Sequence, residues 1–182
     1  MEPTQLKSRA ITEQDCKIIC RFPLNMEELF NLAPNARFPW TAAQMLQTLP
    51  DRLANTAFTI DVDIVGFANF YNYEQGNQTF IGNVVVNPLY RGQGIGKAII
   101  RQMLEIGFSQ YRFKVIHVSC FSTNTRGLLM YKKLGFLPYG IEQRTNHANE
   151  PVALINMQHS HESFLDYCRT RHIPVSDFTA QN

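Results

Sequence analysis

The segment VVVNPLYRGQGIGKAII, residues 84–100, constrains the fold more than any other part of the chain. Three valines, which favour strands, run into Asn87-Pro88, and a loop containing Gly92, Gly94 and Gly96 follows. The apolar residues after the loop recur at helical spacing. A strand, a glycine loop and a helix in this order are typical of a phosphate site, because loop and first-turn N–H groups converge there and the helix dipole favours an anion.

Two common phosphate loops do not fit the spacing. The dinucleotide fingerprint G-x-G-x-x-G would need a glycine where Lys97 stands. A Walker A loop ending at Gly96-Lys97 would need glycine at Arg91 and serine or threonine at Ala98. The remaining pattern is R-x-x-G-x-G opening a helix, with Arg91 and Lys97 adding positive charge. We expect an anion site here rather than a plain strand-to-helix turn.

Composition narrows the class of protein. The chain has 182 residues, 45% of them apolar and 18% charged, which predicts one folded domain over residues 1–182, with a core at 14–158 and an extension at 159–182. A net charge of +2 argues against nucleic-acid and membrane partners. No segment resembles a signal peptide, and the four cysteines lack zinc-like spacing, so we expect a cytoplasmic protein without a metal.

Apolar periodicity, caps and turn residues predict alternating strands and helices. A glycine and an asparagine in the middle of one strand, Gly82-Asn83, predict a bulge there. The order favours a mixed sheet with helices on both faces. The predicted strands are 15–22, 56–61, 64–73, 79–86, 114–120, 136–143 and 152–158, and the predicted helices are 26–32, 42–49, 95–108, 124–134 and 161–171.

A second motif follows the glycine loop. Asn124 is followed seven residues later by Tyr131, and then by Gly135-Phe136. With R-x-x-G-x-G in the expected order and distance, the chain resembles the GCN5-related N-acetyltransferase (GNAT) family. The resemblance implies a mixed α/β protein with the acyl-CoA N-acyltransferase fold. This fold has a central mixed, largely antiparallel twisted sheet of about seven strands, flanked by helices, with a cofactor cleft where strands splay. It also suggests a homodimer.

The resemblance implies transfer of an acetyl group from acetyl-CoA to a primary amine of a small molecule or peptide by direct attack. Tyr131 would be the general acid that protonates the leaving thiolate. Backbone N–H groups beside the bulge would hold the pantetheine arm and the developing oxyanion. Asn124 would touch the cofactor or simply cap its helix. The remaining cofactor-binding residues would be Val84, Val85, Val86, Arg91, Gly92, Gln93, Gly94, Ile95, Gly96 and Lys97.

The general base and the acceptor site are less defined. Many relatives carry a carboxylate on the strand before the loop, where this chain has Gly82-Asn83. Glu74, Glu142, His117 or a water relay are the alternatives. An aromatic-sided acceptor pocket would use Phe30, Phe38, Trp40, Tyr71 and Tyr73. Two other functions stay open: a protein or N-terminal acetyltransferase, and a non-catalytic acyl-CoA-binding regulatory domain.

Overall fold

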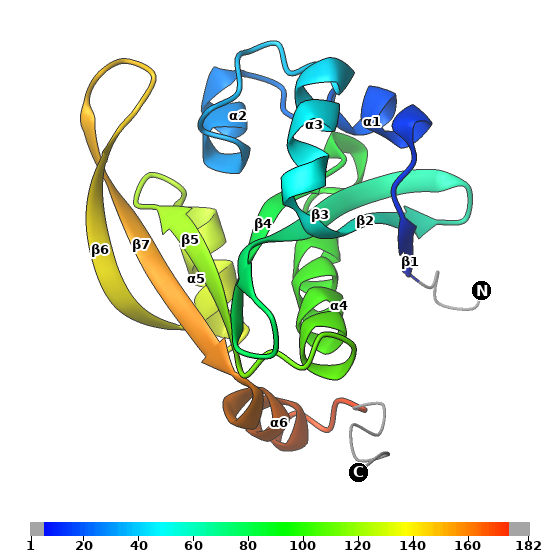
Figure 1. The fold of residues 1–182 in the computed structure, drawn as a ribbon, viewed down its shortest axis with the longest axis vertical. Coiled ribbons are helices and arrows are strands. Elements are labelled where there is room, and N and C mark those ends of the chain that lie inside the picture. Colours follow the sequence, from blue (N-terminus) through cyan, green and yellow to red (C-terminus); the bar gives the residue numbers. More distant parts are fainter. Residues whose placement is uncertain (1–5, 175–182) are drawn as a thin grey trace.

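The computed structural model describes residues 6–174 and contains one seven-stranded mixed sheet (Figure 1). The strand order is β1-β2-β3-β4-β5-β7-β6, and every neighbouring pair is antiparallel except β4 and β5. The predicted fold is therefore confirmed. The strands are β1 Lys7–Ala10, β2 Leu53–Ile60, β3 Asp63–Glu74, β4 Gln78–Val86, β5 Val115–Phe121, β6 Leu137–Thr145 and β7 Pro151–Ser160.

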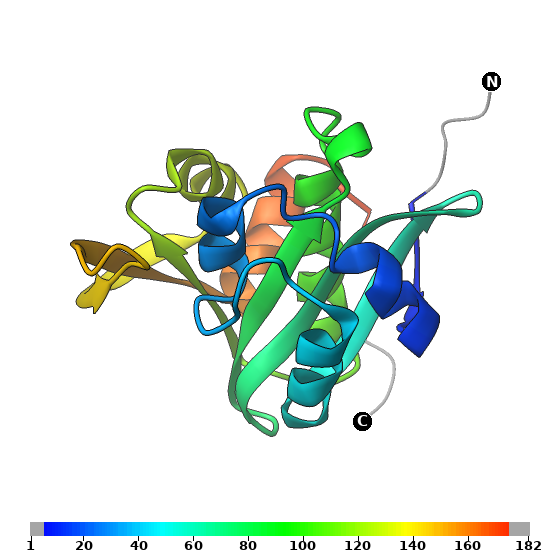
Figure 2. The same ribbon diagram turned by 90° about the horizontal axis from the view of Figure 1, so that it is seen from above.

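Helices cover both faces of the sheet (Figure 2). One face carries α1 Glu13–Ile19, α2 Met26–Leu32 and α3 Ala42–Thr48, whose apolar side chains form a small core with β3 and β4. The other face carries α4 Ile95–Ser109, α5 Thr125–Lys133 and α6 His161–Thr170 over the larger core. Short 3-10 helices, η1 Leu49–Asp51 and η2 Pro88–Tyr90, follow α3 and precede the glycine loop. No helix in residues 6–174 is long and apolar enough to cross a membrane.

Several predicted helix starts are confirmed by their caps. Asn25 accepts a hydrogen bond from the N–H of Glu28 (2.9 Å), and Thr41 accepts one from Gln44 (3.2 Å). These side-chain oxygens satisfy first-turn N–H groups that have no partner within the helix. The sequence therefore places α2 and α3, which roof the central strands, to within a residue.

The predicted strand at 15–22 is wrong, because residues 15–19 belong to α1 and no strand follows them before residue 53. Thr12 and Asp15 form a capping box that starts the helix. The Asp15 carboxylate also pairs with Arg9 of β1, and Cys16 and Ile19 are fully buried beneath the helix. The first strand is instead β1, which pairs antiparallel with β2 and whose side chains are exposed. An exposed edge strand of four residues has no apolar pattern that would predict it.

The parallel strands β4 and β5 splay apart. They pair only at Gln78–Phe80 with Val115–His117. From Ile81 onward the edge of β4 that faces β5 pairs with no strand in the described residues. On its other edge, β5 continues its pairing with β7 to Phe121. The unpaired edges of a splayed sheet present N–H and C=O groups that need other partners. This opening forms the floor of the main cavity described below.

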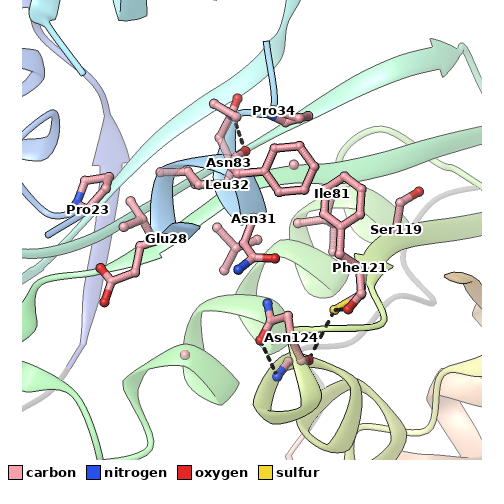
Figure 3. A pocket seen from close by; sticks show the side chains of 18 of the residues that line it. Pro23, Glu28, Asn31, Leu32, Pro34, Ile81, Asn83, Ser119, Phe121 and Asn124 are labelled. Atoms are coloured by element: carbon pink, nitrogen blue, oxygen red, sulfur yellow. Dashed lines mark hydrogen bonds between the residues drawn. The ribbon is translucent and has the colours of Figure 1, made fainter. Parts of the chain in front are cut away.

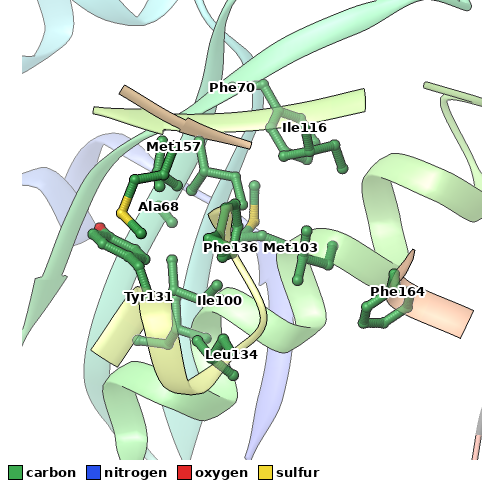
Figure 4. Close-up of a cluster of buried hydrophobic side chains, with 14 of the residues drawn as sticks. Ala68, Phe70, Ile100, Met103, Ile116, Tyr131, Leu134, Phe136, Met157 and Phe164 are labelled. Carbon is green, nitrogen blue, oxygen red and sulfur yellow. The ribbon is translucent and has the colours of Figure 1, made fainter. Parts of the chain in front are cut away.

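The larger core lies beneath the splay and extends into α6 (Figure 4). Ile99 and Met103 of α4 meet Phe70 of β3 and Phe136 after α5, all at most 1% exposed. Phe164 of α6 is also fully buried in this cluster. The segment expected as an extension at 159–182 therefore packs, in its described part, into the main core.

Candidate active site

The splayed strands open into a cavity of about 1220 Å³. Its floor is β4 and β5, its roof is α2 with the following loop, and α5 and the glycine loop close one side (Figure 3). Asn31 of α2 and Asn124 at the start of α5 lie on facing sides of it (Figure 3). The volume exceeds the range typical of a pocket for one drug-sized ligand.

The glycine loop leaves the N-terminus of α4 uncapped and open. Gly94, the N-cap residue of α4, has a left-handed backbone (φ 83°) and offers no side-chain oxygen to the first-turn N–H groups. A Cβ built on Gly92 or Gly94 would meet nothing within 4 Å, so the space over the loop is open. Gly96 has a packing role as well, because its Cβ would lie 3.3 Å from the sulfur of Met130. These features fit the pyrophosphate of coenzyme A at an uncapped helix N-terminus.

The predicted bulge in β4 is confirmed. Phe67 pairs with Val85 and Asn69 with Gly82, so one residue of β3 faces two of β4. Asn83 sits at the bulge with a left-handed backbone (φ 49°). Its side chain donates to the carbonyl of Leu32 (3.0 Å) and accepts from Asn69 (3.1 Å), which ties the bulge to the end of α2. The bulge therefore has a built support, and it sets the direction of the strand that lines the cavity.

Arg91 lines the cavity, but its guanidinium is engaged with the protein. It forms two hydrogen bonds with the carboxylate of Glu28 (2.9 and 3.0 Å). It also donates to the carbonyls of Phe22 (2.9 Å) and Val86 (3.2 Å). A bidentate pair with two further bonds fixes the side chain between α2 and the end of β4. In this arrangement the loop backbone, rather than the Arg91 side chain, faces an incoming phosphate.

Tyr131 of α5 lines the cavity beside β5 and is 8% exposed. Figure 4 shows its ring in the main core with the hydroxyl oxygen at the edge of the cluster. Burial raises its pKa above the ordinary value, so it keeps its proton at neutral pH. The neighbouring Cys120 thiol is also buried, which raises its pKa to about 12. Both groups therefore keep their protons at neutral pH, the Tyr131 hydroxyl and the Cys120 thiol.

The structure brings the two sequence motifs together. The cavity lining includes Tyr131, Asn124, the three valines 84–86 and the loop residues 91, 92 and 94–97. Asn124 also caps α5, accepting from the N–H of Gly127 (2.9 Å), so both roles considered for it are compatible. Gln93 is not in the lining, and its amide donates to the carbonyl of Leu89 (3.3 Å).

The three side chains considered as the general base lie outside this lining. Glu74 is exposed at the end of β3 and accepts from Asn77 (2.7 Å). His117 of β5 stacks on Phe80 of the neighbouring strand β4, and burial lowers the pKa of His117. Hydrogen bonds from Asn156 and from Arg144 lower the pKa of Glu142. The geometry assigns none of the three to the cavity.

The lining contains one carboxylate among the described residues, Glu28. Burial acts to raise its pKa, but hydrogen bonds from Arg91 and from the N–H of Leu24 outweigh it, and the pKa lies below the ordinary value. A carboxylate held in a bidentate pair with a low pKa is a weak base. The described lining therefore provides no strong base.

The aromatic residues expected around the acceptor divide into two groups. Trp40, Tyr71 and Phe30 line the cavity, and Phe30 stacks on Phe121 at the end of β5 (centroids 4.4 Å apart). Phe38 instead lines an adjoining pocket of about 270 Å³, which shares Phe30 with the main cavity. Tyr73 is 50% exposed and belongs to neither lining.

Sequence reasoning missed a residue that reaches the cavity, Arg52. It follows η1, and its guanidinium carbon lies 4.7 Å from the ring centroid of Tyr71. Gly82 makes room for both side chains, because a Cβ there would lie 2.6 Å from Tyr71 and 3.2 Å from Arg52 Nη1. Gly82 thus occupies the strand position where a carboxylate was sought. The chain distance between these residues leaves no local signal for their contact.

Comparison with known sequences agrees with the geometry. The model of the acetyltransferase (GNAT) family matches residues 24–136. An uncharacterized N-acetyltransferase YokL, derived from the SPbeta prophage of Bacillus subtilis, is 26% identical over 140 residues, covering 74% of this chain and 77% of that one. The glucosamine 6-phosphate N-acetyltransferase of Trypanosoma brucei brucei is 41% identical over 64 residues, 35% of this chain and 41% of that protein. The thialysine N-epsilon-acetyltransferase of Bos taurus is 35% identical over 40% of this chain and 44% of that protein.

Solved structures show the same fold. The spermidine N-acetyltransferase of Vibrio cholerae, in complex with CoA and spermine, has a TM-score of 0.76 at 14% identity and covers 90% of this chain and 99% of that one. A GNAT-family acetyltransferase from Bacillus anthracis has a TM-score of 0.71 at 20% identity, covering 86% and 95%. With the family match over more than half of its length, this chain belongs to the acetyltransferase (GNAT) family.

Proposed function

We propose that the protein transfers the acetyl group of acetyl-CoA to a primary amine of a small molecule. One observation carries the proposal: a single cavity is lined by the uncapped glycine loop, by Tyr131 and by the bulged strand β4 with the polar residues around it. Relatives named for small amines, such as glucosamine 6-phosphate and thialysine, support a small acceptor. Transfer to a protein or peptide terminus is the alternative. The homodimer and the cytoplasmic location stay predictions.

Each part of the cavity has a separate task in this proposal. The N–H groups of the loop and of the first turn of α4 bind the pyrophosphate of acetyl-CoA, which supplies an activated thioester when bound. The edge of β4 at Val84–Val86 holds the pantetheine arm, and its N–H groups stabilise negative charge on the thioester oxygen during attack. The Tyr131 hydroxyl donates its proton to the sulfur as it leaves. The product is then an amide and a free thiol.

The acceptor amine loses its proton without a strong protein base. An ordinary amine has a pKa of about 10, so a small neutral fraction exists at pH 7. Water in the cavity accepts the proton released after attack. This predicts a rate that rises with pH as the neutral amine fraction grows, until the amine is fully deprotonated.

Calorimetric titration with acetyl-CoA and release of free thiol test the proposal. We expect micromolar binding and thiol release with at least one primary amine. Gly94→Val places a side chain over the loop and strains a left-handed backbone, and losing one hydrogen bond to a charged group, about 1.5–3 kcal/mol, weakens binding roughly ten- to hundredfold. Gly76→Val is the matched control, because Gly76 has a similar backbone (φ 69°) and open surroundings but lies in the β3–β4 turn.

The outcomes separate the functions. Binding that Gly94→Val weakens and Gly76→Val does not, followed by thiol release, supports the transferase. Binding without thiol release for any amine or peptide supports the regulatory acyl-CoA-binding domain instead. Absence of binding would contradict both.

A further inference from the structure

The cavity lining is basic and polar rather than acidic. It includes Arg52, which lies beside Gly82 at the β4 bulge, and Arg144 of β6. The one carboxylate in the described lining, Glu28, is neutralised by Arg91 on the other side of the cavity. The lining also includes polar side chains that carry no charge, among them Asn35, Gln44, Gln47, Thr48, Asn72 and Thr145.

Arg52 is the clearest sign of a missing partner. Its side chain is half-buried between the Tyr71 ring and the backbone of Gly82. Among the described residues it forms no ion pair, and its guanidinium donates no hydrogen bond. A guanidinium carries five N–H donors in a planar fork that matches a carboxylate or a phosphate.

Desolvation without a partner is unfavourable for a cation. Burial lowers the pKa of Arg52, and the groups that oppose this shift are Tyr71 and then Asp51, which is its own exposed chain neighbour. The ring of Tyr71 offers only a cation–π contact. An anionic group on a ligand would supply the negative charge and the acceptor oxygens that the protein does not provide to Arg52.

Arg144 is a second, more exposed arginine in the cavity lining. It projects from β6 and pairs with Glu142 two residues earlier, with the side chains 49% and 44% exposed. Such exposed pairs contribute little stability, so the guanidinium is free to turn toward a ligand. Glu142 itself is not in the lining.

Resting on the proposed acetyl transfer, we infer that the acceptor is an amine that also carries a carboxylate or a phosphate, and that Arg52 binds this anionic group. The two groups of the acceptor then match the cavity: the amine faces the thioester, and the anionic group faces Arg52. A polyamine is a poor match, because its second cationic group would meet arginines instead of carboxylates. This separates the chain from its structural neighbours that are named for spermidine.

Binding to the CoA-saturated protein tests the inference, because it needs no turnover. Two pairs of probes differ in the anion alone: glucosamine 6-phosphate against glucosamine, and lysine against lysine methyl ester. Spermidine is the polycationic probe. We expect one anionic member to bind at least about tenfold more tightly than its counterpart without the anion, the effect of one hydrogen-bonded charge pair. A difference in affinity within the glucosamine pair indicates a phosphate, and a difference within the lysine pair indicates a carboxylate.

Variants then assign the gap to Arg52. Arg52→Gln should remove the preference for the anionic member, and Arg52→Lys should keep part of it. Arg21→Gln, which removes the same charge at an exposed site at the end of α1, should leave the preference intact. Thermal melts confirm that each variant is folded.

Three results would overturn the inference: equal binding within both pairs, tighter binding of spermidine, or a gap unchanged in folded Arg52→Gln. Thiol release is recorded separately on the same probes. A protein that binds anionic amines but never releases thiol would refute the transferase proposal while leaving the anion site standing.

Discussion

The Tyr131 hydroxyl is a single group on which the chemistry of the site can be tested. The ring is held by the main core, where it lies edge-on to Phe136 (centroids 5.7 Å apart). In Tyr131→Phe the packing therefore stays, and only the proton donor is lost. We expect kcat to fall by about 10²-fold or more, within the range of a general acid, while acetyl-CoA binds as before. Steady-state thiol release and calorimetry measure the two quantities.

The pH profile distinguishes this role from a structural one. Because burial raises the pKa of Tyr131, the wild-type rate should not decline from loss of its proton below about pH 10, the ordinary tyrosine pKa. Tyr139→Phe is the control, since Tyr139 is 50% exposed on β6 and outside the cavity. If Tyr131→Phe kept the full kcat, the proton would have to come from solvent.

At this scale the sequence identified residues that belong to local motifs and missed those that meet only through the fold. Gly94 and Tyr131 were predicted because the spacing within a loop and a helix is local. Arg52 lies far along the chain from Tyr71 and Gly82, and only pairing of β2, β3 and β4 brings the three together. Arg91 was predicted from its motif, but its pairing with Glu28 depends on the position of α2.

At the level of elements, the bulge in β4 depends on a row of asparagine side chains. Asn69, fully buried, donates to both Asn55 and Asn83 (3.1 Å each). In Asn83→Ala the bulge loses its links to Asn69 and Leu32, and alanine takes a left-handed backbone poorly. We expect unfolding to become easier by about 1–3 kcal/mol. The kcat should fall by at least about tenfold, because the β4 donors shift from the thioester oxygen.

Denaturant unfolding and steady-state kinetics measure both effects. Asn149→Ala is the control, because Asn149 has a similar left-handed backbone (φ 59°) in the exposed β6–β7 turn. The Asn149→Ala variant should have similar backbone strain, but its kcat should stay at the wild-type value. A folded Asn83→Ala protein with normal kcat would show that the bulge does not position the reacting groups.

Element prediction failed where a short segment fits two periods. In residues 16–22, apolar side chains at Cys16, Ile18, Cys20 and Phe22 alternate as in a strand, while Cys16, Ile19 and Cys20 also share one helix face. The capping box at Thr12 and Asp15 decides for the helix, and its signal lies upstream of the apolar run. Longer elements such as α4 and β4 contain enough repeats to fix one period, and these were predicted correctly.

For the whole molecule, the splay that creates the cavity weakens the joint between two parts of the sheet. β1–β4 and β5–β7 share only the short parallel pairing at Gln78–Phe80. The large core must therefore hold the two parts together, and it does so through α4 and α5 beneath the cavity and α6 at the closed end (Figure 1). Because the sheet is open at the cavity, the stability of the protein depends on helix packing at the opposite end of the sheet.

Phe164→Ala tests this dependence. Phe164 of α6 is fully buried against Phe108 of α4 (centroids 5.4 Å apart) and near His159 of β7, so it joins β7 to the helix that packs on β3 and β4. Truncating a buried phenylalanine costs about 3–5 kcal/mol, which for a domain of this size lowers Tm by roughly 6–20 °C. Leu137→Ala, at a side chain 65% exposed on β6, should change stability by less than about 0.5 kcal/mol. Below its melting range the Phe164 variant should bind acetyl-CoA normally, because Phe164 is not in the cavity lining. If α6 were an appended segment rather than part of the core, the loss would be small or unfolding would show two separate transitions.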